Sequence, residues 1–269
     1  METETALIDL RREGGVLWLE INRPERHNSL NAVLVGALSE ALSEVLYEAN
    51  DGEIYALVLV ARGRSFSTGG DLAGFLDHAQ HPARLAAYAR RLVGGLHNIV
   101  LDLLSCPVPV IARVHGPVTG GALGLVLAAD VVAMAEDAFL QPYYTEVGFA
   151  PDGGWTALLP ERLGPALAGE IQYLNRRIDA ARARALGLAG HVGPGAELDA
   201  VIKGWLAELA QKDRASLRAS RRLIWDEARR AKVAARLNAE TEAFVELVVR
   251  PETCRRMAQF MANLGASKG

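Results

Sequence analysis

The chain has 269 residues, of which 50% are hydrophobic, and its formal net charge is −3. This composition allows a sizeable buried core, and so small a charge argues against nucleic acid as a partner. Its two cysteines, Cys106 and Cys254, are too few for a disulfide framework, and no zinc-ligand spacing is present. The sequence shows neither a secretory signal nor a charge-free apolar stretch of membrane-spanning length, so we expect a cytoplasmic protein without a membrane partner.

The first half of the chain predicts alternating strands and helices. In chain order, the predicted elements are a strand at 16–21, a helix at 31–50, a strand at 54–61, a helix at 82–104, a strand at 108–114, a short helix of small residues at 120–129 and a strand at 131–134. The loop RPERHNSL separates the first strand from the first helix. This order predicts an α/β fold in which helices cover a largely parallel sheet.

The second half has a different character. After about Pro151 the strand signals fade, and residues 196–264 have a nearly continuous helical pattern, broken near Asp213 and Pro251. No long linker separates the halves. We therefore predict an α/β core over 1–195 and a helical C-terminal region over 196–269, which we expect to serve oligomerisation.

Two glycine-rich stretches carry the strongest functional signal. RSFSTGGDLAGF spans residues 64–75, VHGPVTGGALGLVLAAD spans 114–130, and each follows an apolar strand-like run and leads into a helix. Glycine at a strand-to-helix turn lets the backbone approach a ligand and present its N–H groups. Two such turns can place two N–H donors on one oxygen. The sequence therefore predicts an oxyanion hole, which stabilises charge on a carbonyl oxygen when a proton leaves the α-carbon.

Four motifs together resemble the crotonase superfamily, the enoyl-CoA hydratase/isomerase family, over nearly the whole chain. They are LEINRPERHNSLN (19–31), FSTGGDL (66–72), VHGPVTGGALGL (114–125) and VGFAPDGGWTALLPERLG (147–164). The resemblance implies a spiral of ββα units with a helical C-terminal trimerisation region. It also implies an acyl-CoA substrate, an enolate-like intermediate, and a homotrimer or dimer of trimers. Coenzyme A would belong to the substrate, so no separate cofactor and no metal are expected.

The resemblance assigns roles to individual positions. The two oxyanion donors fall on the backbone N–H groups of Gly70 and Gly121. Residues of the RPERHNSL loop become candidates for contacts with coenzyme A, namely Arg26, His27 and Ser29. The pantetheine and thioester channel is expected to be lined by Phe66, Ser67, Thr68 and Leu72. Asp71 is a further candidate at the site, although a cap on the following helix is the better interpretation.

The chain departs from a hydratase at both catalytic glutamates of that family. The first position is Gly124, and the second falls on Tyr143 or Tyr144 according to the direction of counting. Glycine and tyrosine do not replace two carboxylates that hold one water. The sequence therefore disfavours hydration by a carboxylate pair.

Two acids near this site remain as candidates. Asp152 matches the place where dienoyl-CoA isomerases of the family carry a catalytic aspartate, but it could instead cap a helix over 153–159. Glu146 lies near the lost glutamate, although a surface or salt-bridge role is the better interpretation. Tyr144 and its neighbour Tyr143 could donate a hydrogen bond or pack as aromatic walls.

One carboxylate suffices for a double-bond shift, because it can take a proton from one carbon and return it to another. We therefore expect an enoyl-CoA isomerase. A hydratase that uses Asp152 or Glu146, and an inactive acyl-CoA binder, remain the alternatives.

Overall fold

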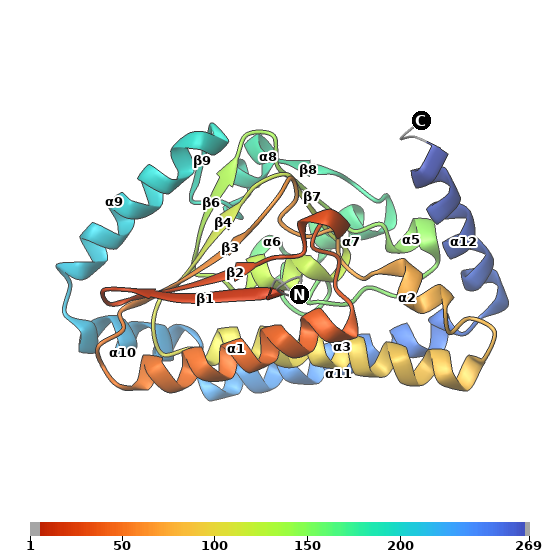
Figure 1. The fold of residues 1–269 in the computed structure, drawn as a ribbon, viewed down its shortest axis with the longest axis horizontal. Coiled ribbons are helices and arrows are strands. Elements are labelled where there is room, and N and C mark those ends of the chain that lie inside the picture. The colour runs from red at the N-terminus through yellow and green to blue at the C-terminus, as the bar shows by residue number, and fades with distance from the viewer. Residues whose placement is uncertain (1–5, 267–269) are drawn as a thin grey trace, which may run out of the picture.

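A six-stranded sheet organises the molecule, which the computed structural model describes from residue 6 to residue 266 (Figure 1). Its strands are β1 (Ile8–Glu13), β2 (Val16–Ile21), β3 (Ala56–Ala61), β4 (Val110–Val114), β6 (Val131–Ala135) and β9 (His191–Gly193). They are ordered β1-β2-β3-β4-β6-β9, with β1 antiparallel to β2 and the other pairs parallel. The largely parallel α/β fold is therefore confirmed.

A second, three-stranded sheet gives the fold its spiral character. It consists of β5 (Pro117–Thr119), β7 (Phe139–Gln141) and β8 (Ile178–Asp179), in the order β5-β7-β8. Because β5 follows β4 and β7 follows β6, each of these two passes of the chain leaves one strand in each sheet before a helix begins, whereas β1 and β2 both belong to the first sheet. The segment after β3 joins the second sheet through a bridge between Ser67 and Val118. This arrangement is the ββα spiral that the family resemblance implies.

The helices surround these sheets. They are α1 (Ala32–Asn50), α2 (Leu72–Leu76), α3 (Pro82–Ser105), α4 (Leu123–Leu127), α5 (Tyr144–Val147), α6 (Leu159–Leu163), α7 (Pro165–Tyr173), α8 (Ala180–Ala185), α9 (Leu198–Ala210), α10 (Arg214–Ile224), α11 (Glu227–Val248) and α12 (Pro251–Ala266), with short 3-10 helices η1 (Pro24–Arg26), η2 (Gly120–Ala122) and η3 (Gly195–Glu197). Helix α3 packs against both α1 and α11 along one side of the sheet (Figure 1).

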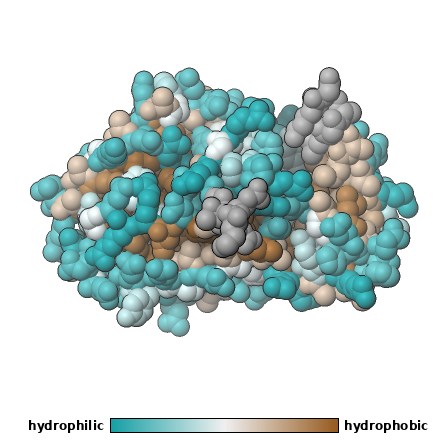
Figure 2. All heavy atoms as spheres, viewed as in Figure 1, coloured by the Kyte–Doolittle hydropathy of each residue, from teal (hydrophilic) through white to brown (hydrophobic). Residues whose placement is uncertain are grey.

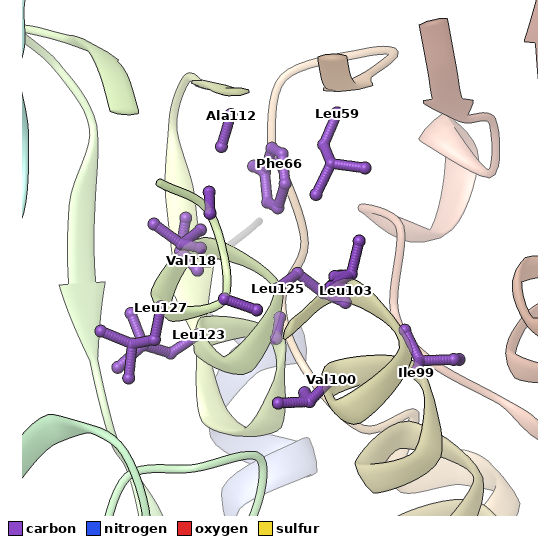
Figure 3. Packing of buried hydrophobic residues seen from close by; sticks show 14 of the residues in the cluster. Leu59, Phe66, Ile99, Val100, Leu103, Ala112, Val118, Leu123, Leu125 and Leu127 are labelled. Atoms are coloured by element: carbon purple, nitrogen blue, oxygen red, sulfur yellow. The ribbon is translucent and has the colours of Figure 1, made fainter. Parts of the chain in front are cut away.

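The hydrophobic core lies between the sheets and α3. Figure 3 shows Leu59 of β3, Phe66, and Leu103 of α3 converging with apolar side chains of the short helix α4. Phe66 is fully buried there. Because burying such a side chain contributes about 2–3 kcal/mol, this cluster fixes the two loops that leave β3 and β4.

The C-terminal helices fold back over the rest of the chain. Helix α11 packs along α3, and α12 packs against α2 and α5. None of the helices in the described part of the chain is long and apolar enough to cross a bilayer. The face in Figure 2 is largely hydrophilic, with separate hydrophobic areas.

Several local expectations were wrong. Residues 153–158 form turns, and the helix begins only at Leu159, because Gly153 and Gly154 have φ values of +63° and +92° that a right-handed helix does not admit. The small strands β8 and β9 lie in the half where strand signals fade, since two or three residues are too few for a periodic pattern. The C-terminal helical run has a third break, where Asp226 caps α11 by accepting a hydrogen bond from Arg229 N.

Candidate active site

A cavity of about 550 Å³ opens where the two glycine turns meet. Loop 23–30, helices α2, α3 and α5, and the C-terminal helices α11 and α12 complete its walls. It brings together eleven of the residues singled out from the sequence, which are Arg26, His27, Ser29, Thr68, Gly70, Asp71, Leu72, Gly121, Tyr143, Tyr144 and Asp152.

The two glycine turns are in direct contact, as the oxyanion-hole hypothesis requires. Ser67 N donates to Pro117 O at 3.2 Å, and Thr119 N donates to Ser67 O at 3.1 Å. Gly69 has φ +75°, and a Cβ atom there would lie 2.5 Å from Thr119 O. Only glycine fits this crossing. The second turn does not follow β4 directly, because the short strand β5 intervenes and carries the turn to its neighbour.

Both predicted donor peptides are held by their carbonyl oxygens. Gly69 O accepts a hydrogen bond from Leu30 N at 2.7 Å, and Gly120 O accepts one from Trp155 Nε1 at 2.7 Å. In a trans peptide the next N–H points away from the carbonyl. The N–H groups of Gly70 and Gly121 therefore face away from these anchors. Within residues 6–266 neither N–H donates to a protein acceptor, so both are available to a ligand in the cavity.

Asp152 lies beside the second donor. Its side chain is buried, and its Oδ1 accepts a hydrogen bond from Tyr144 Oη at 2.5 Å. A Cβ atom on Gly121 would lie 2.9 and 3.0 Å from the two carboxyl oxygens. The carboxyl group is thus next to the Gly121 peptide. It does not cap a helix over 153–159, since those residues up to 158 form turns.

Burial raises the pKa of Asp152 to about 6. The negative charge of Glu240 acts in the same direction. The hydrogen bond from Tyr144 acts in the opposite direction. The pKa of Tyr144 is raised well above its ordinary value by burial and by the Asp152 carboxyl, so its hydroxyl remains a donor at neutral pH.

Gly124, the position expected for the first hydratase glutamate, has no room for a side chain. A Cβ atom on Gly124 would lie 2.3 Å from Gly153 O and 2.8 Å from Val100 Cγ2. The turn that follows Asp152 fills this space. Tyr144 is one of the two tyrosines that could stand at the second glutamate position. Its hydroxyl donates a hydrogen bond to Asp152, so its role is not limited to aromatic packing.

Glu146 and two channel candidates lie elsewhere. Glu146 is exposed on α5, outside the cavity lining, and accepts a hydrogen bond from Asn175 Nδ2 at 3.4 Å. Phe66 belongs to the hydrophobic core, because its side chain packs among the buried residues around Leu59 and Leu103. Ser67 is also buried, and its hydroxyl donates to Asn28 O at 2.7 Å. Neither Phe66 nor Ser67 lines the cavity.

Asp71 has the structural role expected of a cap. Its carboxyl accepts a hydrogen bond from Ala73 N at 3.2 Å and pairs with Arg23 at 2.9 Å, and both side chains are mostly buried. Arg23 also donates to the hydroxyl of Ser29 at 2.9 Å. Asp71 therefore ties the first glycine turn to loop 23–30 while one side of it faces the cavity.

Arg26 and His27 lie on loop 23–30, where it borders the cavity. Arg26 is exposed, and His27 Nδ1 lies 3.0 Å from Ser65 Oγ. Phe75, Phe149 and Phe244 also line the cavity and form a cluster with ring centroids 4.8–5.7 Å apart. The cavity is therefore bordered by polar side chains of loop 23–30 and by an aromatic cluster.

Sequence reasoning missed the residues that support this site from behind. They are Trp155, which holds the Gly120 carbonyl, and His97 and Glu240, which bond to the turn after Asp152. Trp155 stands within the recognised APDGGW motif, so that motif offered a signal. His97 and Glu240 lie on long helices with no motif around them.

Comparison with known proteins shows the family of the chain. The family model described as enoyl-CoA hydratase/isomerase matches residues 11–263. A protein of Mycobacterium bovis described as probable enoyl-CoA hydratase echA12 is 33% identical over 235 residues, covering 86% of this chain and 81% of that protein. The mitochondrial Δ(3,5)-Δ(2,4)-dienoyl-CoA isomerase of Homo sapiens is 32% identical over 205 residues, covering 73% of this chain and 61% of that protein.

Solved structures show the same fold. An enoyl-CoA hydratase/isomerase from Mycobacterium paratuberculosis superposes with a TM-score of 0.81 at 30% identity, covering 96% of this chain and 99% of the other. An enoyl-CoA hydratase from Bacillus halodurans superposes with a TM-score of 0.86 at 23% identity, covering 94% of this chain and 99% of the other. The second likeness, at that identity, concerns the fold alone.

Proposed function

This chain belongs to the enoyl-CoA hydratase/isomerase family, and on that premise we propose that it is an enoyl-CoA isomerase that shifts a carbon–carbon double bond in the acyl group. The observation that carries the proposal is the single carboxyl group of Asp152 beside the Gly121 peptide. The place of a second carboxylate at Gly124 is filled by the turn itself. One acid without a partner supports proton transfer between two carbons better than activation of a water by two acids.

The proposed reaction needs two groups of this chain. The thioester oxygen accepts hydrogen bonds from Gly70 N and Gly121 N. The Asp152 carboxylate removes a proton from the α-carbon, which lies between the thioester carbonyl and the double bond, and the electron pair of that C–H bond moves into the carbonyl to form an enolate on that oxygen, conjugated with the double bond. The carboxylic acid then returns the proton to the γ-carbon, the end of the double bond farther from the thioester. The enolate reverts to the thioester carbonyl, and the double bond now joins the α- and β-carbons, without gain or loss of atoms.

The environment of Asp152 suits both halves of this cycle. A pKa of about 6 lets the same group be mostly ionised at pH 7 and still donate a proton readily once it is protonated. Tyr144 holds Oδ1 and so leaves Oδ2 for the transferred proton. The relatives described as dienoyl-CoA isomerases support a double-bond shift as the type of reaction.

The rest of the cavity suggests how the substrate is oriented. We propose that Arg26, His27 and Ser29 contact the coenzyme A moiety, since an arginine fork suits a phosphate. Thr68 and Leu72 would flank the pantetheine and thioester. The aromatic cluster around Phe244 favours an apolar acyl group. Coenzyme A enters as part of the substrate, and the proposed reaction uses no further cofactor.

Two separate assays test the proposal, one with a 3-enoyl-CoA and one with a 2-enoyl-CoA. Formation of the 2-enoyl isomer from the first, with little hydration of the second, is the expected result. A hydratase is the second candidate, because similar proteins are described as probable hydratases. Rapid hydration of the 2-enoyl-CoA without bond migration would establish it. Binding of both thioesters without turnover of either would establish an inactive acyl-CoA binder.

We further propose a homotrimer or dimer of trimers in the cytoplasm. Leu223 and Ile224 at the end of α10 are 75% and 54% exposed, which is unusual for two adjacent large apolar residues. Light scattering coupled to gel filtration tests the assembly. A monomer at micromolar concentration would contradict it.

A further inference from the structure

The turn that carries Asp152 is held by two buried side chains from distant helices. The backbone N–H groups of Gly154, Thr156 and Ala157 all donate to the carboxylate of Glu240, at 2.9, 2.7 and 3.0 Å. The hydroxyl of Thr156 adds a fourth hydrogen bond at 2.6 Å. Residues 153–158 form no regular helix, so these bonds replace the ladder that would otherwise fix the segment.

Glu240 accepts every one of these bonds, which is the pattern of an ionised carboxylate. Its side chain is 2% exposed, on the face of α11 that packs against α3. Donors concentrated on a buried carboxylate satisfy its charge without a cation, and such charge-assisted bonds are stronger than neutral ones. Replacing the anion therefore weakens all four contacts together.

His97 on α3 completes the support. Its Nε2 accepts a hydrogen bond from Gly153 N at 3.1 Å. Its Nδ1 lies 2.9 Å from Thr241 Oγ1, whose own hydrogen goes to Leu237 O. Nδ1 is therefore the protonated nitrogen, and the imidazole is neutral. The N–H of Gly153 is thus held by a residue of α3, whereas the N–H groups that bond to Glu240 are held by a residue of α11.

The same turn also controls the oxyanion peptide. Trp155 lies between the N–H groups that Glu240 binds, and its Nε1 holds Gly120 O at 2.7 Å. Since the Gly120 carbonyl and the Gly121 N–H belong to one peptide plane, moving the turn moves both the proton carrier and a donor to the thioester oxygen.

We propose that Glu240 is a positioning residue, which acts through the turn 153–157 to set the placement of both Asp152 and the Gly121 N–H. The inference rests on the proposed function, because it concerns the same site. It extends the site to a helix of the C-terminal region that carries no recognisable motif. Glu240 does not line the cavity, so its effect reaches a bound acyl-CoA only through the turn.

Glu240 acts on Asp152 through charge as well as position. The titratable groups that face the Asp152 carboxyl are Tyr144 from α5, His97 from α3 and Glu240 from α11. The negative charge of Glu240 raises the pKa of Asp152. Loss of that charge lowers this pKa, so the rate, which needs the ionised base, would rise at a lower pH.

The test compares wild type, Glu240→Gln and Glu242→Gln. Glu242 is a matched control, because it lies on the same helix, is exposed and pairs with Arg90 at the surface. For Glu240→Gln we expect kcat to fall about 10- to 100-fold with little change in KM. The midpoint of the pH–rate profile should move to lower pH. For Glu242→Gln we expect wild-type kcat and midpoint.

A folded Glu240→Gln variant with wild-type kcat and midpoint would overturn the inference, and so would equal changes in both variants. Circular dichroism and gel filtration check folding. If Glu240→Gln does not fold, Thr156→Val removes one of the four bonds at an exposed residue and should lower kcat to a smaller extent, whereas a wild-type kcat would overturn the inference.

A titration without turnover separates this inference from the proposed function. Carbon-13 NMR of labelled aspartate, assigned with Asp152→Asn, reports the Asp152 midpoint directly. A wild type that isomerises no enoyl-CoA would refute the proposed function. The titration of the Asp152 carboxyl group still tests the role of Glu240. A lower midpoint in Glu240→Gln supports that role, and an unchanged midpoint overturns it.

Discussion

Replacing Asp152 with asparagine should make the protein inactive and more stable at the same time. The amide keeps the shape of the carboxyl group and an oxygen for the Tyr144 hydrogen bond, but it cannot accept and return a proton as a carboxylate does. Loss of a general base lowers kcat by about 10²- to 10⁴-fold. Because both oxyanion N–H groups remain, KM for the thioester should change little.

The stability gain follows from the cost of burying the charge. The pKa of Asp152 rises from an ordinary value of 3.8 to about 6 in the folded protein. The folded state therefore holds more protons between these two values, and its free energy of unfolding falls as pH rises through them. At pH 8 this penalty reaches about 3 kcal/mol as an upper limit. The asparagine variant avoids it, so the difference from wild type should grow from pH 4 to pH 7.

Two measurements check this prediction. Isomerisation of a 3-enoyl-CoA is followed from pH 5 to pH 8, and the wild-type rate should rise through a midpoint near pH 6. Urea unfolding of wild type and Asp152→Asn is measured at pH 5 and pH 8. Glu146→Gln is the control, since Glu146 is exposed and outside the cavity, and it should keep wild-type activity. Full activity in Asp152→Asn would refute the base, and a stability difference that does not change with pH would refute the buried charge.

Three further substitutions test single contacts of the site. Tyr144→Phe removes a hydrogen bond that lowers the pKa of Asp152, so the pH–rate midpoint should move to higher pH; an unmoved midpoint would contradict this. Trp155→Phe removes the anchor of the second oxyanion peptide and should lower kcat about 10-fold in single-turnover assays, whereas a loss of melting temperature alone would assign it a packing role. Gly124→Ala places a methyl group 2.3 Å from a carbonyl oxygen of the neighbouring turn, and calorimetry should show destabilisation of about 1–3 kcal/mol. Unchanged stability would show that the turn can move away and would contradict the prediction.

The elements with a clear period were predictable from the sequence. Helix α3 begins at Pro82 and ends at Ser105, within one residue of the predicted 82–104, because its apolar spacing continues over many turns. The first strand spans Val16–Ile21 as predicted. Short elements were not predictable. Strands such as β8 exist only because a neighbouring strand offers hydrogen bonds, which a local pattern does not record.

The candidate site was predictable where function acts through backbone and motif. The close approach of the turns at Gly69 needs glycine, and glycine is visible in the sequence. The position of Glu240 has no such mark, because its four partners are mostly backbone N–H groups that any residue supplies. Phe66 shows the reverse case, since its motif position predicts a cavity residue whereas its side chain packs into the core.

The buried carboxyl groups of Glu240 and Asp152, which meet at the same turn, are satisfied to different degrees, and that difference separates their roles. Glu240 accepts four hydrogen bonds, whereas Asp152 receives one side-chain hydrogen bond, from Tyr144. A carboxylate with many donors is stabilised as an anion, while one with few donors in the same apolar surroundings is held near neutrality. A group that exchanges a proton near pH 6 must remain incompletely satisfied, so the feature that makes Asp152 useful as a proton carrier also destabilises the fold. The rate lost and the stability gained in Asp152→Asn are therefore two measures of one arrangement.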